Sequence, residues 1–186
     1  MKFIPQSIQD VIVIEPIVHN DVRGYFVETY KQKLLYDALG FQVNFIQDNE
    51  SKSTSKGVLR GLHFQVPPFA QNKLVRVIKG EILDVVVDIR RKSPTFGQYI
   101  SVKLSGKNKK QLFIPVGFAH GFIVLSEEAI FAYKVDAYYS AEHEKGIKYN
   151  DKDINIDWGF LEKDILLSKA DQNFPDLDSI KNYFIL

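Results

Sequence analysis

Short runs of Val, Ile, Phe and Tyr, each closed by Gly, Pro, Asn or Asp, recur along this chain and favour a fold built from strands. The clearest pair of runs covers 73–90, with a turn at Gly80. In its second half Asp84, Val86 and Asp88 fall on one face of a strand, and the aliphatic residues between them fall on the other. One face of this strand is therefore expected to pack on a core, and the other is partly polar.

Helix signals are few by comparison. They cover 31–39, which Gly40 can close as a C-terminal cap, and a short amphipathic segment at 176–184. Regularly spaced short strands predict an all-β jelly-roll sandwich or barrel with a few short helices, in one domain over 1–186 whose last part, 150–186, is irregular. The other predicted strands cover 11–16, 24–29, 41–50, 98–104, 111–115, 121–125 and 129–138.

Composition excludes several classes of function. The 186 residues carry 24 Lys and Arg against 23 Asp and Glu, so the formal charge of +1 predicts no general attraction to nucleic acid or to an anionic membrane. The absence of Cys removes thiol nucleophiles and thiolate metal sites. No apolar run is long enough to span a membrane, and no signal peptide is evident, so we expect a soluble, cytoplasmic protein.

Two of the four His residues, His63 and His120, stand in runs that are otherwise apolar. Either one alone could be a core histidine that is hydrogen-bonded to the backbone. Small β-barrels also bind metals through several His and a carboxylate. A cupin metal site usually begins with two His spaced two apart, but the residue two positions after His63 is Gln65, which weakens the metal interpretation.

Cationic residues form a second group of candidates. Arg23 and Arg60 each precede a Gly and begin an apolar strand, so their guanidinium groups could converge on a phosphate. Lys73 lies in the 73–90 pair, as does Arg76, for which a solvated surface position is the ordinary expectation. The chain has no Gly-rich phosphate loop, so side chains would have to hold a nucleotide.

Tyr133 and Asp171 complete the candidates from pattern alone. Tyr133 shares strand parity with Phe131 and Val135, so its phenol becomes an inward polar group if that face points into a barrel. On pattern alone, packing is the more common role for such a residue. Asp171 lies among apolar residues and could orient a distant His, although a turn or helix cap is an equally good local interpretation.

Taken in order, these segments resemble the dTDP-4-dehydrorhamnose 3,5-epimerase family over nearly the whole chain. LRGLHFQ and GFAHGF are the most specific of the matching strings. The strings are DVRGYFVE at 21–28, QDNE at 47–50, GVLRGLHFQ at 57–65, QNKLVRVIKGE at 71–81, PVGFAHGF at 115–122 and YYS at 138–140.

The resemblance implies a metal-free and cofactor-free jelly roll of the cupin type. It also implies a homodimer in which N-terminal strands are exchanged and one subunit contributes to its neighbour's nucleotide site. The implied substrate is dTDP-4-dehydro-6-deoxy-D-glucose, inverted at C3 and C5 to dTDP-4-dehydro-L-rhamnose.

Catalytic roles also follow from the resemblance. His63 is implied as the base, with Asp171 accepting a hydrogen bond from its ring, and Lys73 is placed at the C4 oxygen. Tyr133 is implied as the acid on the opposite face. These residue types suit proton removal beside a ketone, which needs a base of near-neutral pKa and a donor for the enolate oxygen.

Substrate-binding residues are implied in the same way. His120 is placed beside the sugar, Glu144 in the nucleotide pocket, and Tyr139 against the thymine ring. Members of the family commonly carry Lys just before the Asp of the pair, whereas this chain has Ala170 there and Lys169 one position earlier. Phe26 is implied near the nucleotide, and Lys73 is implied to bind substrate at the C4 oxygen. The implied contacts to nucleotide and diphosphate come from Arg23, Glu28, Gln47, Asn49 and Arg60.

Three alternatives stay open at this point. A relative of the family could invert only C3 or only C5 of a related dTDP-keto sugar. A jelly roll could bind nucleotide sugars without catalysis, although that function would not require His63, Lys73 and Tyr133 together. A metal-dependent cupin is the most remote of the three.

Overall fold

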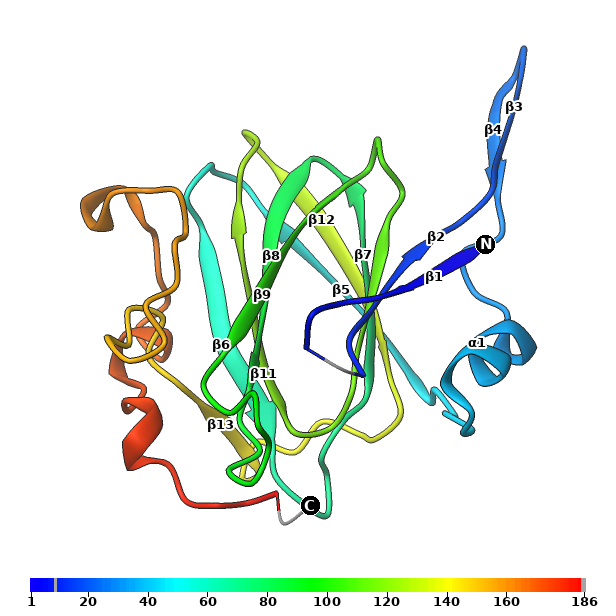
Figure 1. The fold of residues 1–186 in the computed structure, drawn as a ribbon. Helices are drawn as coiled ribbons and strands as arrows, with labels where there is room; N and C mark the ends of the chain where they lie inside the picture. Colours follow the sequence, from blue (N-terminus) through cyan, green and yellow to red (C-terminus); the bar gives the residue numbers. More distant parts are fainter. Residues whose placement is uncertain (9, 185–186) are drawn as a thin grey trace.

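The computed structural model describes residues 1–8 and 10–184. Its strands form two antiparallel sheets that face each other and a separate hairpin (Figure 1). The six-stranded sheet has the order β1-β2-β10-β7-β12-β5, the five-stranded sheet has the order β13-β6-β11-β8-β9, and the hairpin is β3-β4. This is the jelly-roll architecture that the spacing of the runs predicts. The strands are β1 Lys2–Pro5, β2 Ile12–Glu15, β3 Val18–Asp21, β4 Gly24–Val27, β5 Gln47–Ser53, β6 Leu59–Gln65, β7 Lys73–Lys79, β8 Glu81–Asp88, β9 Tyr99–Ser105, β10 Gln111–Ile114, β11 Phe118–Val124, β12 Ala129–Val135 and β13 Glu144–Gly146.

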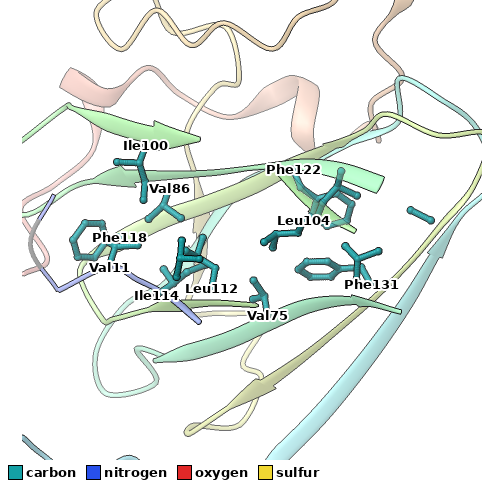
Figure 2. Packing of buried hydrophobic residues seen from close by; sticks show 14 of the residues in the cluster. Val11, Val75, Val86, Ile100, Leu104, Leu112, Ile114, Phe118, Phe122 and Phe131 are labelled. Atoms are coloured by element: carbon teal, nitrogen blue, oxygen red, sulfur yellow. The ribbon is translucent and has the colours of Figure 1, made fainter. Parts of the chain in front are cut away.

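A hydrophobic core fills most of the space between the two sheets. Figure 2 shows Val75 of β7 and Phe131 of β12 facing Val86 of β8 and Phe122 of β11. The rings of Phe122 and Phe131 stack with their centroids 4.4 Å apart. Burying each side chain of this size contributes about 1.5 to 3 kcal/mol, so this core is the main stabilising contact between the sheets.

Strand β8 is buried on both faces, which places carboxylates inside the sandwich. Leu83 and Val87 face the C-terminal segment, whereas Asp84 and Asp88 share the inner face with Val86. Asp84 and Asp88 are fully buried. The partly polar face predicted for this strand therefore points into the molecule and not toward solvent.

Helix α1, Gln32–Leu39, confirms the helix predicted at 31–39. Gly40 ends it with φ 76°, a left-handed conformation that glycine adopts without strain, and its N–H donates to the carbonyl of Tyr36. Leu35 packs with Phe113 on the outer face of the six-stranded sheet. The helix therefore covers that sheet and lies away from the space between the sheets.

The C-terminal segment lies against the outer face of the five-stranded sheet, beside β6 and β13 (Figure 1). Trp158 and Leu177 are buried there. Asp151 ties the segment together, because its carboxylate accepts the backbone N–H groups of Ile154 at 3.0 Å and Leu177 at 2.7 Å. In the described part of this segment, regular structure is limited to an isolated β-bridge between Leu166 and Val58 and the 3₁₀ turns η1 Glu162–Asp164, η2 Asp171–Asn173 and η3 Leu177–Ser179.

Two of the predicted elements are wrong over most of their length. The helix predicted at 176–184 is only the turn η3, because Ile180 packs on the sheet from an extended segment and not from a helix face. The strand predicted at 41–50 begins only at Gln47, because Val43 and the residues around it pack beside α1. Among the described residues, no helix is long and apolar enough to cross a membrane.

Candidate active site

A β-bulge in β6 places Arg60 and His63 on the same face of the sheet. Three positions separate these residues, so an ordinary strand would point them to opposite sides. Their partners on β11 are only two positions apart: His63 pairs with His120 and Arg60 with Phe122. The extra residue on β6 therefore turns both side chains toward the space between the sheets.

Glycine permits this close approach of β6 and β11. A Cβ on Gly61 would lie 2.6 Å from the Cα of Gly121 and 2.7 Å from the carbonyl oxygen of His120. Gly61 also has φ +117°, which other residues rarely adopt. The Arg-Gly pair that the sequence singled out is therefore part of the geometry that orients His63.

Polar side chains from both sheets share this inner face, as the strand registers show. Tyr133 pairs with Val75 and Asn49, and Glu144 pairs with Gln65. Partners directly opposite each other in an antiparallel pair have their side chains on the same face. The inner polar set is Gln47, Asn49, Arg60, His63, Gln65, Lys73, Asp84, His120, Tyr133 and Glu144.

His63 and Asp171 form a hydrogen-bonded pair at the edge of this set. His63 Nε2 lies 2.6 Å from Asp171 Oδ1. Asp171 is 4% exposed, whereas the His63 side chain is 31% exposed. Burial raises the pKa of Asp171, but hydrogen bonds from His63, Ser168 and the Gly61 backbone outweigh burial, so the pKa lies below its ordinary value. An ionised Asp171 makes Nε2 the protonated nitrogen and leaves Nδ1 of His63 as the basic atom.

Phe174 holds the other side of the His63 ring. The two rings meet edge to face with centroids 5.5 Å apart. Phe174 fits there because Gly146 has no side chain: a Cβ on Gly146 would lie 2.4 Å from Phe174 Cε2. A cavity of about 440 Å³ opens beside this group and is lined by Arg60, His63, Glu144, Asp171 and Phe174 among others.

Lys73 projects from the first residue of β7 into the same interior. Burial lowers the pKa of its ammonium group to about 8, although the negative charges of Glu144 and Asp84 act in the opposite direction. Lys73 therefore stays mostly protonated at neutral pH and loses its charge a little above it. Such a group supplies a positive charge in a place where little water screens it.

Tyr133 lies on β12, in the sheet opposite to the one that carries His63. Burial raises the pKa of its phenol, and the charge of Glu144 raises it further, while Arg60 lowers it. The phenol therefore keeps its proton at neutral pH. His63 and Tyr133 thus lie on facing sheets, one able to accept a proton and the other able to donate one.

His120 and Asp84 make a second, deeper pair. His120 Nε2 lies 3.0 Å from Oδ1 and 2.9 Å from Oδ2 of Asp84. The side chain of His120 is 8% exposed and that of Asp84 is fully buried. His120 therefore lies in the core and shares the inner polar face with His63, but its Nε2 contacts a carboxylate and not the backbone group that the core interpretation expected.

Four of the residues implied in nucleotide binding are linked by hydrogen bonds. Gln47 Nε2 donates to Asn49 Oδ1 at 2.8 Å, and the backbone N–H of Tyr139 donates to Gln47 Oε1 at 3.4 Å. The hydroxyl of Tyr139 donates to Glu144 Oε2 at 2.9 Å. The Tyr139 ring is exposed, so it can contact a planar base at the mouth of the cavity.

Arg23, Phe26 and Glu28 are not brought to this site within the chain. Arg23 and Phe26 lie on the β3-β4 hairpin, which projects away from the sheets (Figure 1). The Arg23 side chain is 86% exposed and pairs with Asp21, and Phe26 is 70% exposed. Glu28 follows the hairpin and lies near Lys31.

The structure adds residues to the site that the sequence pattern did not single out. Gln65, noted only as the reason against a metal site, fixes the backbone on both sides of Tyr139: its Nε2 donates to the carbonyl of Tyr138 and its Oε1 accepts from the N–H of Ser140. The sequence around Asp84 could have indicated a buried carboxylate, because this residue alternates with aliphatic residues in a strand that is apolar on its other face. Phe174 gave no signal, because its contact with Gly146 is long-range. The described residues contain no group of three or more His, Asp and Glu that could hold a metal.

Comparisons with known proteins identify the family. The family model described as dTDP-4-dehydrorhamnose 3,5-epimerase matches residues 5–179. The Shigella flexneri protein named dTDP-4-dehydrorhamnose 3,5-epimerase is 53% identical over the full length of both chains.

Solved structures agree with this match. The Elizabethkingia anophelis dTDP-4-dehydrorhamnose 3,5-epimerase has a TM-score of 0.92 at 49% identity, covering 98% of this chain and 99% of its own. The Legionella pneumophila dTDP-6-deoxy-D-glucose-3,5-epimerase, solved with dTDP-4-keto-L-rhamnose, has a TM-score of 0.92 at 47% identity, covering 97% and 94%. With matches of this extent in sequence and in structure, the chain belongs to the dTDP-4-dehydrorhamnose 3,5-epimerase family.

Proposed function

We propose that this chain converts dTDP-4-dehydro-6-deoxy-D-glucose to dTDP-4-dehydro-L-rhamnose by inverting C3 and C5. Family membership supports the reaction, and the observation that carries the mechanism is the His63–Asp171 pair, with Nε2 and Oδ1 2.6 Å apart at the edge of a cavity. Both carbons lie next to the C4 ketone, so one base and one electrophilic group can serve both inversions.

His63 removes the proton from each carbon in turn. Asp171 holds the ring through Nε2, so Nδ1 accepts the proton, and the negative carboxylate stabilises the imidazolium that forms. The 31% exposure of the His63 side chain leaves room for a sugar ring to reach it. General base catalysis of this kind contributes about 10² to 10⁴ in rate.

Lys73 stabilises the enolate that forms at the C4 oxygen. Proton removal puts negative charge on that oxygen, and a fixed ammonium group in a water-poor site lowers the energy of this state. Its pKa of about 8 keeps Lys73 charged at neutral pH. Removing one such fixed donor typically costs about 10² to 10³ in rate.

Tyr133 donates a different proton to the same carbon from the opposite face of the sugar. Inversion needs a donor on the side away from the base, and β12 lies in the sheet that faces β6. The raised pKa of Tyr133 keeps its phenol protonated until it is needed. After each inversion the phenolate regains a proton from solvent and His63 releases to solvent the proton that it removed, so the same pair can act at the second carbon.

The nucleotide part of the substrate is bound by two groups of residues. In the first group Arg60 and Glu144 line the cavity, and hydrogen bonds link Glu144 to Tyr139, Tyr139 to Gln47 and Gln47 to Asn49. The second group, Arg23, Phe26 and Glu28, lies on or beside a hairpin that projects from its own chain (Figure 1). We propose a homodimer in which this hairpin enters the site of the other subunit.

Product NMR tests the proposed function. dTDP-4-dehydro-6-deoxy-D-glucose is incubated with the protein in deuterated water, with His63→Ala as the control. We expect deuterium at both C3 and C5, the L-rhamno product, and no label with the variant. Label at one carbon would instead establish a single epimerase, and saturable dTDP binding without label would establish a binding module.

A further inference from the structure

Asp84 is a buried carboxylate with no part in the mechanism above. It lies in the middle of β8, its side chain is fully buried, and it faces the interior that holds Lys73 and His120. Removing a carboxylate from water costs several kcal/mol unless other charges and hydrogen bonds compensate. A charge in this position therefore needs an explanation.

Asp88, four residues later on the same face of β8, shows how neighbouring side chains stabilise a buried carboxylate with a structural role. It accepts from the Arg90 side chain at 2.9 and 2.7 Å, from Ser93 at 2.6 Å and from Thr95 at 2.7 Å. Despite its burial, the pKa of Asp88 lies below the ordinary value because of these donors. Its charge is thus fully compensated by neighbouring side chains.

Asp84 has a different set of neighbours. Among the described residues its only hydrogen-bonding side chain is His120, through Nε2 at 3.0 and 2.9 Å. Burial raises the pKa of Asp84, and only His120 and the charge of Lys73 act against this. The compensation for Asp84 therefore comes from two groups that the family resemblance places beside the sugar.

Lys73 is a buried charge of the opposite sign, because its ammonium group is removed from water in the same interior. Two carboxylates support its charge: Glu144 from β13 and Asp84 from β8. The cationic or neutral groups that share the interior are Arg60 and His63 from β6, His120 from β11 and Tyr133 from β12. Glu144, the stronger of the two, lines the cavity and already accepts a hydrogen bond from the exposed Tyr139, whereas the Asp84 side chain is fully buried and is the deeper anion.

We infer that Asp84 is a positioning residue for the epimerisation: its carboxylate holds the His120 ring by Nε2 and serves as the buried counter-ion that keeps Lys73 charged. This role rests on the proposed function, because it assumes that Lys73 stabilises the enolate in that reaction. Holding Nε2 of His120 also directs Nδ1 of the same ring away from Asp84, which makes that atom available to a substrate hydroxyl.

The sign of the pH effect follows from the charges. Lys73 must be protonated to stabilise an enolate, so activity falls as the pH rises through its pKa. Removing a nearby negative charge makes the protonated form less stable, and so this pKa decreases. The alkaline limb of the pH profile must therefore move to lower pH when Asp84 becomes neutral.

The test compares Asp84→Asn with Asp88→Asn, which neutralises an equally buried carboxylate on the same face of the same strand. In Asp84→Asn we expect the alkaline limb of kcat/KM to move down by about one pH unit or more. Each enzyme's kcat/KM at pH 8 is expressed as a fraction of its own plateau value. This fraction should be about fivefold smaller for Asp84→Asn than for the wild type. In Asp88→Asn the limb stays in place, whatever the loss of thermal stability. An unmoved limb in Asp84→Asn would overturn the inference.

A second measurement on the wild type needs neither turnover nor a folded variant. With carbon-13 in the Asp carboxyl groups and nitrogen-15 in the His rings, we expect Asp84 to be ionised at pH 7 and His120 to carry its proton on Nε2. A protonated Asp84 at pH 7 would refute the counter-ion role. If the wild type failed to turn over the dTDP-keto sugar, the proposed function would fall, while these NMR signals would still report on the Asp84 contacts.

Discussion

His63 and Asp171 are separated by 108 positions in the chain, yet Nε2 of one lies 2.6 Å from Oδ1 of the other. His63 is part of the five-stranded sheet, and Asp171 is carried by the irregular C-terminal segment that covers the outer face of this sheet. The orientation of the base therefore depends on a segment with almost no regular structure, which Asp151 and a set of buried apolar side chains hold in place.

Asp171→Asn is expected to lower kcat by about 10² or more, because an amide cannot stabilise the imidazolium and no longer selects the Nε2–H tautomer. Asp178→Asn, an exposed carboxylate of the same segment, is the matched control and should keep normal kinetics. The measurement is the steady-state kcat of the two variants and of the wild type. Equal kcat for Asp171→Asn and the control would show that the pair has no part in catalysis.

Gly146→Ala tests the packing that holds the His63 ring. The new Cβ would lie 2.4 Å from Phe174 Cε2, so Phe174 must leave its place against His63. We expect a loss of about 1 to 3 kcal/mol in the free energy of unfolding, as for other overpacked sites, together with a lower kcat. The double variant Gly146→Ala/Phe174→Ala should lose less stability than the sum of the losses in the two single variants, because the new Cβ no longer clashes with a phenyl ring. Wild-type stability in Gly146→Ala would argue against this contact.

Activity of the wild type is expected to fall above about pH 8, where Lys73 loses its proton. Tyr133 cannot produce this limb, because its pKa is raised above that of an ordinary phenol. The measurement is the pH profile of kcat/KM, which reports the groups of the free enzyme. Lys73→Gln should lower the plateau and abolish the limb. A limb that survives in Lys73→Gln would have to come from another residue.

Mixing two inactive variants tests the shared site of the proposed homodimer. In a mixed dimer of Arg23→Ala and His63→Ala, one of the two sites contains His63 from one subunit and Arg23 from the other. Random exchange of subunits should therefore restore up to about a quarter of the wild-type sites. If Arg23 acts within its own chain, every site carries a defect, and the mixture should stay as inactive as its parents.

The sequence predicts much of this fold because the alternation of side chains is a local signal. The strands at 73–90 and the helix closed by Gly40 depend on neighbours in sequence, and both are found in the structure. The segment at 176–184 could not be predicted in the same way. Its apolar residues satisfy a helical pattern equally well, and only contact with the distant sheet selects the extended conformation.

The residues of the site likewise fall into those that local sequence reveals and those that depend on contacts between distant segments. His63 and Tyr133 stand out because a polar residue interrupts an apolar strand, which is visible in the sequence. The inward position of Arg60 beside His63 depends on a bulge, and the contact of Phe174 depends on a missing Cβ at Gly146. Pairing and packing between distant segments decide both, so no local pattern could predict them.

Exchange and inversion measured together, in deuterated water, test most directly whether one base and one acid act on opposite faces of the sugar. The variants are His63→Ala and Tyr133→Phe, with Tyr138→Phe as the control because Tyr138 is exposed. We expect no deuterium with His63→Ala. With Tyr133→Phe we expect deuterium to enter at C3 and C5 with retained configuration, and with the control both exchange and inversion should be normal. Inversion by Tyr133→Phe at the wild-type rate would contradict the account.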